Sequence, residues 1–372
     1  MMKVLLDYRM VTWSGIGRYS QELARALHER DDIELCLIKT KDNQLPIELT
    51  DVSYFDAGAH PLSSKGFREL RMATRSFVPD LLHCTHISTP NLKGLVSSEG
   101  KKIPVVTTLH DLTPIIVDGV MPSFAKRAIY SGLNQRAVNW SSALITPSQH
   151  TIGDLEKYFP KIACPITAIP LAADELLKVE PVKPSAMNYL SPVFQRNFLL
   201  SFGNTKPHKD LPTLFAAFEQ VAAGHDDISL LLVGKEPPNY LRQHNSSDLL
   251  DRVQFTGPIS DEELVWLYQR ARAFVFPSLY EGFGLPPLEA MSFGCPVIVA
   301  DTTSLPEVVD DAGVKVAPKD VQGFAGAITR VLKDEEHTQD LEDRGLERSK
   351  EFSWEKVAHA TVSVYKSVYN GI

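Results

Sequence analysis

The chain has 372 residues, of which 44% are hydrophobic and 23% are charged, and this length and composition suit two globular domains better than one core. A formal net charge of −8 argues against a general nucleic-acid binder, whose surface would be basic. The start of the chain lacks the apolar core of a signal peptide, and no run approaches the ~18 apolar residues of a membrane span. We therefore expect a cytoplasmic protein, either soluble or attached peripherally to the inner face of the membrane.

The four cysteines lie far apart and include no C-x-x-C pair: Cys36, Cys84, Cys164 and Cys295. This pattern is typical of reduced thiols in a cytosolic protein. The chain has no strand-end D-x-D and no His/Cys cluster with ligand spacing, so we expect neither a metal site nor a cofactor.

In the first half of the chain, short apolar runs alternate with amphipathic stretches. Strands are predicted at Lys3–Leu6, Ile33–Ile38, Leu81–His83, Val105–Leu109 and Ala143–Thr146. Helices are predicted at Ile16–Glu29, Lys65–Phe77, Phe124–Trp140 and Ile152–Tyr158. Short strands that alternate with helices indicate βαβ units and a parallel sheet.

The segment Leu171–Gln195 interrupts this alternation, since it contains prolines and has no clear periodicity, and it is predicted to be a linker. Strands then follow at Phe198–Phe202, Ile228–Val233, Val253–Phe255, Ala273–Phe276 and Val297–Val299. Helices are predicted at Asp210–Ala222, Asp261–Ala271, Pro286–Phe293 and Val321–Lys333. The chain ends in an amphipathic helical pattern from Trp354 to Val368, whose apolar face must pack on another element. The whole pattern predicts an α/β protein with two doubly wound halves.

The sequence SGIGRYSQ follows the first strand, and its Gly15 and Gly17 lie where a parallel sheet passes the chain to a helix. Backbone N–H groups at such a place commonly meet a phosphate. A dinucleotide fingerprint would need Gly or Ala at Ser20 and an acid at the end of the second strand, which ends instead in Lys39 and Thr40. A hydride-transfer enzyme is therefore disfavoured, and the structural alternative is a tight turn without a ligand.

The second half opens with FLLSFGNTKPHKDL, in which a strand ends near Gly203 and a helix begins near Asp210. The loop between them carries Lys206, His208 and Lys209. Basic side chains beside a helix N-terminus create an anion site, because their charge adds to the helix dipole. The alternative is a solvated basic loop.

A third turn, SLYEGFGLPPLEAMSFG, follows the predicted strand Ala273–Phe276 and places Glu281 at the carboxyl end of that strand. Its two glycines let the backbone approach a ligand closely, and its two prolines suit the first turn of a helix. The N–H groups from Phe283 to Leu285 then point outward along the helix axis, where a diphosphate fits.

Two carboxylates, Glu281 and Glu289, lie on either side of that diphosphate position. They are placed to accept hydrogen bonds from hydroxyls on two separate parts of one molecule, and a nucleotide sugar has that layout. The alternative is that Glu289 only favours the helix dipole and that Glu281 is exposed. The sequence SLPE at Ser304–Glu307 matches a capping box, for which we favour a structural role.

These residues resemble the retaining glycosyltransferases of family 4, which have the two-lobed GT-B fold. The resemblance spans nearly the whole chain and is carried by GIGRY, LHD at Leu109–Asp111, GNTKPHKD, TGPISDEELVWLYQRARAFVFPSLYEGFGLPPLEAMSFGCPVIVAD and FSWEKVA. It implies two doubly wound Rossmann-like domains that face each other across a cleft. Residues 1–185 plus 355–372 would form the acceptor-side domain and residues 186–354 the nucleotide-sugar-binding domain, with the C-terminal helix crossing back onto the first.

The resemblance also implies roles for individual residues. His110 would face the reacting sugar, Lys209 would bind the diphosphate, and Glu281 would hold hydroxyls of the donor sugar. Glu289 would hold the ribose hydroxyls. The other implied donor-binding positions are Gly15, Gly17, Asn204, Lys206, the main chain around Phe255, and the N–H groups of Phe283, Gly284 and Leu285. For His110 the structural alternative is a core histidine at a strand end.

The chain departs from the family at one position of the phosphate loop. The family often has Arg directly after the loop glycine, where this chain has Asn204. Asn cannot neutralise charge, so either Lys206 or His208 compensates or phosphate binding is weaker. The resemblance further implies a metal-independent substitution with retention, in which the leaving phosphate oxygen helps to deprotonate the acceptor hydroxyl.

GIGRY together with GNTKPHKD resembles the branch that uses GDP-mannose in polysaccharide or O-antigen assembly, with a glycan or lipid-linked glycan as the acceptor. The alternatives are a glycosyltransferase that uses a UDP-sugar, a nucleotide-sugar 2-epimerase of similar build, and a nucleotide-sugar-binding protein without catalysis. The predicted helix Lys65–Phe77 carries a basic stripe that fits an anionic membrane surface, a lipid diphosphate or an ordinary solvated face. Its members are Lys65, Arg68, Arg71 and Arg75.

Overall fold

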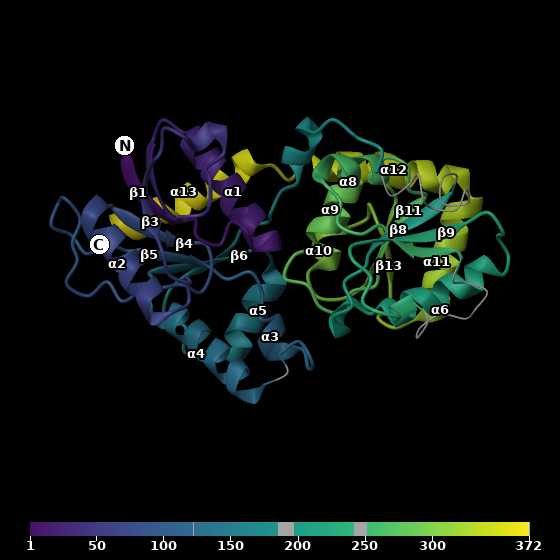
Figure 1. Cartoon of the computed structure of the whole chain (residues 1–372), viewed down its shortest axis with the longest axis horizontal. Coiled ribbons are helices and arrows are strands. Elements are labelled where there is room, and N and C mark those ends of the chain that lie inside the picture. The colour runs from purple at the N-terminus through teal and green to yellow at the C-terminus, as the bar shows by residue number, and fades with distance from the viewer. Residues whose placement is uncertain (122, 185–196, 242–250, 372) are drawn as a thin grey trace. The chain divides into compact units, whose positions relative to one another are not determined.

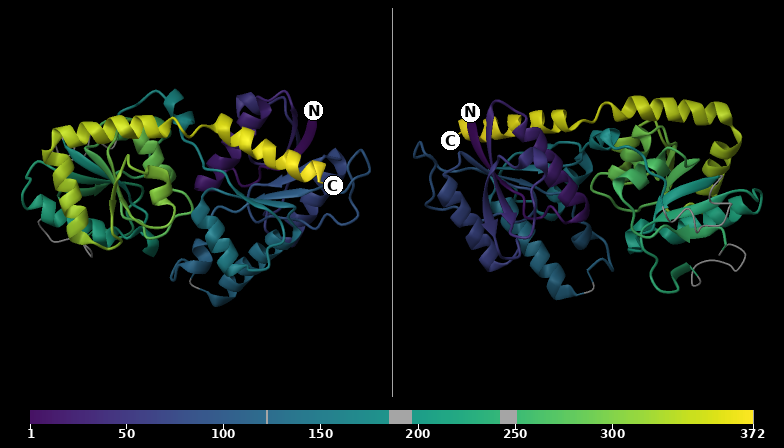
Figure 2. Two further views of the ribbon diagram at one scale, coloured as in Figure 1. Left: turned by 180° about the vertical axis from the view of Figure 1, so that it is seen from behind. Right: turned by 45° about the horizontal axis from the view of Figure 1, so that its top comes forward.

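The computed structural model describes residues 1–121, 123–184, 197–241 and 251–371. They form two compact units, and in each a parallel sheet has helices on both faces (Figures 1 and 2). Unit 1 comprises Met1–Ile116, Met121–Leu171 and Ser353–Ile372, and unit 2 comprises Val117–Val120 and Ala172–Phe352. The predicted α/β architecture with two doubly wound halves is confirmed. After the short segment Val117–Val120, the chain returns to unit 2 at Ala172, earlier than the boundary expected at residue 185.

Unit 1 is built on a seven-stranded sheet with the order β3-β2-β1-β4-β5-β6-β7, in which all pairs are parallel. Its strands are β1 (Met2–Asp7), β2 (Ile33–Thr40), β3 (Ser53–Ala57), β4 (Leu81–Cys84), β5 (Val105–Thr108), β6 (Ala143–Thr146) and β7 (Ile166–Ala168). Its helices are α1 (Ser14–His28), η1 (Ile47–Leu49), α2 (Ser64–Phe77), α3 (Thr113–Ile116), α4 (Phe124–Trp140), α5 (Gln149–Tyr158) and α13 (Trp354–Asn370). Every residue of β4, β5 and β6 is buried, as parallel strands covered on both faces require.

The C-terminal helix α13 belongs to unit 1, where it packs against α1. The hydroxyl of Tyr365 lies 2.6 Å from Nδ1 of His83 in β4. The rings of Trp354 and Tyr19 have centroids 6.2 Å apart. The apolar face predicted for the end of the chain is therefore buried against the first half of the sequence.

Unit 2 is built on a six-stranded parallel sheet with the order β10-β9-β8-β11-β12-β13. Its strands are β8 (Phe198–Phe202), β9 (Ser229–Val233), β10 (Val253–Phe255), β11 (Ala273–Phe276), β12 (Val297–Ala300) and β13 (Val314–Val316). Its helices are η2 (Asp174–Lys178), η5 (Pro207–Lys209), α6 (Leu211–Ala222), α8 (Asp261–Tyr268), α9 (Leu285–Ser292), α10 (Leu305–Val309), α11 (Val321–Lys333) and α12 (Glu335–Ser349). The predicted linker begins within this unit, where η2 contacts α9, and its part from residue 185 onward lies outside the described residues.

The strands that the sequence pattern missed are β3, β7 and β13, and each lies at the edge of its sheet. An edge strand buries few side chains: only Ala57 is buried in β3, only Val316 in β13, and no residue in β7. The missed helix α12 is rich in charge and buries only Thr338, Leu341 and Gly345. The helices α3 and α10 are too short, at four and five residues, to show a helical period.

The four cysteines are free thiols, as the sequence predicted. Burial raises the pKa of the Cys36 thiol, so this side chain stays protonated near neutral pH. Among the described helices, none combines the length and the apolar composition that a membrane crossing requires.

Candidate active site

The turn between β11 and α9 carries Glu281, as the sequence predicted. β11 ends at Phe276, and α9 begins at Leu285. The hydroxyl of Ser278 donates to Oε1 of Glu281 at 2.6 Å, and the N–H of Glu281 donates to Oγ1 of Thr303 at 3.2 Å. The position of Glu281 is therefore fixed through both its side chain and its main chain.

A second loop, which follows β8, brings Lys209 to the same carboxylate. Nζ of Lys209 lies 2.5 Å from Oε1 of Glu281, and the two side chains are only 17% and 16% exposed. The N–H of Leu279 donates to the carbonyl oxygen of His208 at 2.7 Å, which ties the two loops together. The alternative of an exposed Glu281 is therefore wrong, since this carboxylate is mostly buried and paired.

The N-terminus of α9 presents backbone donors. Its N-cap residue, Gly284, has a φ of +124° and supplies no side-chain cap. A Cβ at this position would lie 2.8 Å from the Leu305 side chain, so both conformation and packing require glycine. Within the part of the chain that the structure describes, the N–H groups of Phe283, Gly284 and Leu285 have no hydrogen-bond partner. Free donors at the positive end of a helix dipole favour an anion.

Glu289 lies in the interior of unit 2, although it is only one turn inside α9. It is 4% exposed, and the hydroxyl of Tyr268 donates to its Oε2 at 2.9 Å. Tyr268 belongs to α8 and is itself buried, with its ring stacked on Phe293 at 6.2 Å between centroids. Glu289 is thus anchored to α8, whereas Glu281 is anchored to the loop after β8.

Two residues without an assigned ligand role hold the glycine-rich turn in place. The capping box expected at Ser304–Glu307 does not form, because Ser304 makes no side-chain cap for α10. Its buried hydroxyl lies instead 3.0 Å from the carbonyl oxygen of Glu281 and 2.6 Å from that of Phe283. Thr303, with a φ of +54°, accepts the N–H of Glu281. No local pattern signals these roles, since the bonded residues are 21 to 23 positions apart.

The basic residues of the loop after β8 differ in their environments. Asn204 and Lys206 are exposed, and Oδ1 of Asn204 accepts the N–H of Lys206 at 3.1 Å. His208 is buried, and this burial, together with the charge of Lys209, lowers the pKa of His208 to about 4. His208 is therefore neutral at pH 7 and cannot replace the charge of the missing arginine. Of the two residues expected to compensate for Asn204, Lys206 is the one that carries a charge.

Phe255 ends the edge strand β10 and packs over the loop glycine. A Cβ on Gly203 would lie 2.2 Å from the Phe255 ring, so packing within the protein already requires glycine there. Phe255 is paired with Leu232, whose carbonyl oxygen accepts the N–H of Thr256 at 2.9 Å. In a parallel ladder this arrangement leaves the N–H and C=O of Phe255 on the open edge of the sheet. Main-chain contact with a ligand is therefore possible at this residue.

In unit 1, the two glycines of GIGRY meet different structural demands. Both lie in the first turn of α1. A Cβ on Gly17 would lie 2.1 Å from the carbonyl oxygen of Val11, whereas a Cβ on Gly15 would meet nothing within 4 Å. Packing within the turn therefore explains why residue 17 is glycine, but it does not explain the glycine at position 15.

His110 follows β5 and lies among polar and aromatic side chains. Its Nε2 donates to the carbonyl oxygen of Thr85 at 2.8 Å, since a carbonyl can only accept. Burial lowers the pKa of His110, so the ring is neutral and its Nδ1 is an acceptor. The Tyr19 ring meets it edge-on, with centroids 4.8 Å apart. His110 thus has one nitrogen held by the protein and one available to accept a hydrogen bond.

The basic stripe on α2 has three exposed members instead of four. Arg71 donates to the carbonyl oxygens of residues 91 and 93, at 2.6 Å and 2.8 Å. Arg71 is therefore half-buried, and its guanidinium holds a neighbouring loop. The exposed members are Lys65, Arg68 and Arg75.

Family models match both halves of the chain. The model described as Glycosyltransferase Family 4 matches residues 13–175, and the model described as Glycosyl transferases group 1 matches residues 191–348. Together they account for most of the sequence.

Similar curated proteins cover nearly the full length. O-antigen chain mannosyltransferase B of Escherichia coli is 28% identical over 98% of this chain and 100% of its own. Glycogen synthase of Mycobacterium tuberculosis is also 28% identical, over 100% of this chain and 96% of its own.

Solved structures show the same fold at lower identity. Sucrose-phosphate synthase of Thermosynechococcus elongatus has a TM-score of 0.76 at 21% identity, with full coverage of both chains. HepE of Anabaena, solved in complex with UDP-glucose, has a TM-score of 0.74 at 19% identity and covers 99% of this chain and 100% of its own. These likenesses establish the GT-B type of fold.

Proposed function

Because the chain belongs to the family 4 glycosyltransferases and carries a group 1 domain in its second half, we propose that it transfers a hexose from a nucleotide diphosphate sugar to a glycan hydroxyl. The favoured donor is GDP-mannose, and the favoured acceptor is a glycan or lipid-linked glycan of polysaccharide or O-antigen synthesis. The observation that carries the proposal is the ion pair between Lys209 and Glu281. Glu281 lies just before the N–H groups at the start of α9, which are available to a ligand. The mannosyltransferase of Escherichia coli, similar over 98% of this chain, supports the choice of sugar.

In this proposal the diphosphate is bound by Lys209 and by the backbone donors of residues 283–285. Lys206 adds positive charge, and Asn204 positions the loop that carries it. Glu281 accepts hydrogen bonds from hydroxyls of the donor sugar. Lys209 and Glu281 are in contact, so the bond between the sugar and the diphosphate of the donor would lie next to this pair.

The nucleoside end of the donor has its own proposed contacts. Glu289, oriented by Tyr268, accepts the ribose hydroxyls. The open N–H and C=O of Phe255 pair with the edge of the base. From unit 1, we assign Gly15 to the diphosphate and the acceptor nitrogen of His110 to a hydroxyl of the reacting sugar. Gly17 contributes by shaping the turn that carries Gly15.

We propose that the transfer retains the configuration of the sugar. The bond between the anomeric carbon and the phosphate oxygen breaks, and the acceptor oxygen bonds to the same face of that carbon. The acceptor proton passes to the departing phosphate oxygen, and nucleoside diphosphate leaves. Lys209 and the α9 donors stabilise the negative charge that develops on the phosphate.

The same groups support a reaction that needs no metal ion. A cationic side chain and a helix N-terminus supply the positive field that a divalent cation provides elsewhere. Activity should therefore persist in EDTA. Loss of turnover in EDTA that Mg²⁺ or Mn²⁺ restores would contradict this part of the proposal.

A UDP-sugar is the second candidate donor, since HepE was solved with UDP-glucose and a glycogen synthase is among the full-length relatives. The test measures nucleoside diphosphate release with GDP-mannose, UDP-glucose and UDP-N-acetylglucosamine, each with a panel of glycan acceptors. Release that depends on acceptor and is fastest with GDP-mannose is expected. Fastest release with a UDP-sugar would replace the mannose assignment, and binding without any release would identify a binding protein. Conversion of a UDP-sugar to its C2 epimer, without transfer to an acceptor, would identify an epimerase.

We also propose that α2 rests on anionic lipid. Three exposed cations on one helix, Lys65, Arg68 and Arg75, supply electrostatic attraction of about 1 kcal/mol each near such a surface. The protein should float with vesicles that contain anionic phospholipid and not with neutral vesicles. Equal flotation with both, or with neither, would remove the membrane contact.

A further inference from the structure

Unit 1 has a pocket of about 440 Å³ at the carboxyl-end edge of its sheet, where the chain leaves β2 and β3. It lies between α2 and the edge strand β3, near the end of β2. Lys41, Lys65 and Arg68 line it, together with two carboxylates and two apolar side chains.

The two carboxylates in this pocket already have partners. Oδ1 of Asp56 pairs with Nζ of Lys39 at 2.6 Å, and Oε2 of Glu69 accepts the N–H of Ala59 at 3.0 Å. By contrast, the charged groups of Lys41, Lys65 and Arg68 have no ion-pair or hydrogen-bond partner in the described ranges. Because Lys39 neutralises Asp56, three cations share the pocket with the single negative charge of Glu69, and the pocket has an excess of positive charge.

These cations come from separate elements. Lys65 and Arg68 are three positions apart on α2 and so share one face, whereas Lys41 directly follows β2. Their convergence around one hollow costs repulsion in the empty protein, and an anion would relieve it. Arg and Lys together favour a phosphoryl group, whose several oxygens accept charge-assisted hydrogen bonds.

The remaining walls are apolar. Phe55 of β3 packs partly into the core, and Met72, one turn beyond Arg68 on α2, is 57% exposed. Bare phosphate gains nothing from such walls, but carbon next to a phosphoryl group would cover them. The pocket therefore suits an organic phosphate better than an inorganic one.

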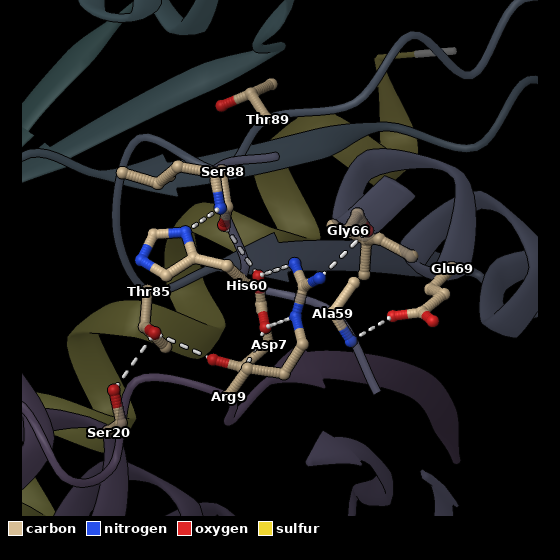
Figure 3. A network of polar contacts seen from close by, with 12 residues as sticks. Asp7, Arg9, Ser20, Ala59, His60, Gly66, Glu69, Thr85, Ser88 and Thr89 are labelled. Carbon is tan, nitrogen blue, oxygen red and sulfur yellow. Dashed lines mark hydrogen bonds and ion pairs between the residues drawn. The ribbon is translucent and has the colours of Figure 1, made fainter. Parts of the chain in front are cut away.

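The helix that carries most of these groups is fixed from inside the unit (Figure 3). Nη1 of Arg9 donates to the carbonyl oxygen of Gly66 at 2.8 Å, and its other nitrogens bind Asp7 at 2.6 Å and 2.7 Å. The hydroxyl of Ser88 donates to the same carboxylate at 2.6 Å. This buried network holds the first turn of α2, and so it fixes the backbone that carries Lys65 and Arg68.

We propose that this pocket binds the phosphoryl group of a phosphate or diphosphate ester with an apolar chain, which is the chemistry of a lipid-linked acceptor. The inference rests on the proposed function, because it assigns a substrate class to the same enzyme. The pocket shares Lys65 and Arg68 with the surface contact proposed for α2, whereas Lys41 belongs only to the pocket and Arg75 only to the exposed stripe.

The test is isothermal titration calorimetry of the full chain with geranyl diphosphate. The parent protein carries Lys209→Ala, so that the proposed donor diphosphate position does not contribute. Lys41→Ala and Arg68→Ala should each weaken binding about tenfold, as expected for loss of one charge-assisted contact. The matched control Lys126→Ala, which removes an exposed cation of α4 in the same unit but outside the pocket, should leave the affinity unchanged. Absence of binding, or an equal loss in the control, would overturn the proposal.

Two further measurements separate the possible outcomes. Inorganic pyrophosphate should bind at least about tenfold more weakly than the geranyl ester, because it cannot cover the apolar walls. Equal affinity would identify a site for free phosphate and overturn the lipid-linked ligand.

Nucleoside diphosphate release by the wild-type protein with a water-soluble glycan acceptor reports on the proposed function independently. Release without geranyl diphosphate binding overturns the pocket alone, and binding without release supports the pocket while overturning the transferase.

Discussion

Nζ of Lys209 lies 2.5 Å from Oε1 of Glu281, although the two residues are 72 positions apart in the chain. They follow β8 and β11, which are neighbours in the sheet of unit 2. Because parallel strands end at the same edge of a sheet, their following loops meet there. A fixed cation and a fixed carboxylate at this edge are the basis of the proposed donor site.

Lys209→Ala and Glu281→Ala should each lower turnover by at least about 100-fold, because each removes a preorganised charge at the reacting end of the donor. The double variant should lose much less than the product of the two single effects, since the residues act as one pair. Steady-state kinetics with the true donor, together with thermal melts to verify folding, checks this. Near-normal turnover in both single variants would contradict the assignment.

Ser304→Ala should lower kcat/KM about tenfold or more without unfolding the protein, because its hydroxyl holds the carbonyl oxygens of Glu281 and Phe283. Ser292 is a matched control: it is a buried serine of the same unit, and its hydroxyl donates to the carbonyl oxygen of Leu288 at 2.9 Å. Both variants should lose about 1 kcal/mol of stability, but only Ser304→Ala should lose activity. Equal activity in the two variants would show that Ser304 has no positioning role.

Gly17→Ala should destabilise unit 1 by about 2 kcal/mol or more, because its Cβ would overlap the carbonyl oxygen of Val11. Gly15→Ala should fold as well as the parent or slightly better, since alanine favours a helix and has room there. If Gly15 approaches the diphosphate, its variant should raise KM for the donor. Urea unfolding and donor kinetics measure the two effects. A stable Gly17→Ala protein would refute the packing argument, and unchanged kinetics in Gly15→Ala would remove Gly15 from the donor site.

The stability of the protein should fall as the pH drops below about 6.5. Burial lowers the pKa of His83 to about 3. Between that value and the ordinary histidine pKa the unfolded chain binds a proton that the folded chain does not. The free energy of unfolding therefore decreases by about 1.4 kcal/mol per pH unit for this residue as the pH falls through that window.

Urea unfolding between about pH 6.5 and pH 4 tests this linkage. His83→Gln should be less stable overall, because it changes the hydrogen bonds to Tyr365 and Thr108, but its stability should depend less steeply on pH. Replacement of the exposed His359 by Gln should leave the slope unchanged. An identical slope in the parent and in His83→Gln would exclude buried His83 as its source.

Much of the fold followed from local pattern. The inner strands are short apolar runs that are buried on both faces, so they can be recognised from the sequence. Strands β6, β8 and β11 begin and end at the predicted residues. Edge strands such as β3 and β7 bury too little to show such a run. The turn that carries Glu281 was also recognisable, because two glycines, two prolines and two carboxylates lie within a few residues.

The sequence by itself determined which segments form the inner strands, which residues are near the turns, and the family that the chain resembles, since each depends on neighbours within one segment. Only the tertiary structure decided that Lys209 meets Glu281, that Tyr268 holds Glu289, and that Ser304 supports the turn instead of capping a helix. The tertiary structure also decided that Arg71 donates to a neighbouring loop and that Lys41 lines the same pocket as Lys65 and Arg68. The physical reason is that a hydrogen bond or ion pair forms between groups that are close in space, and the sheet brings together residues whose separation along the chain carries no signal.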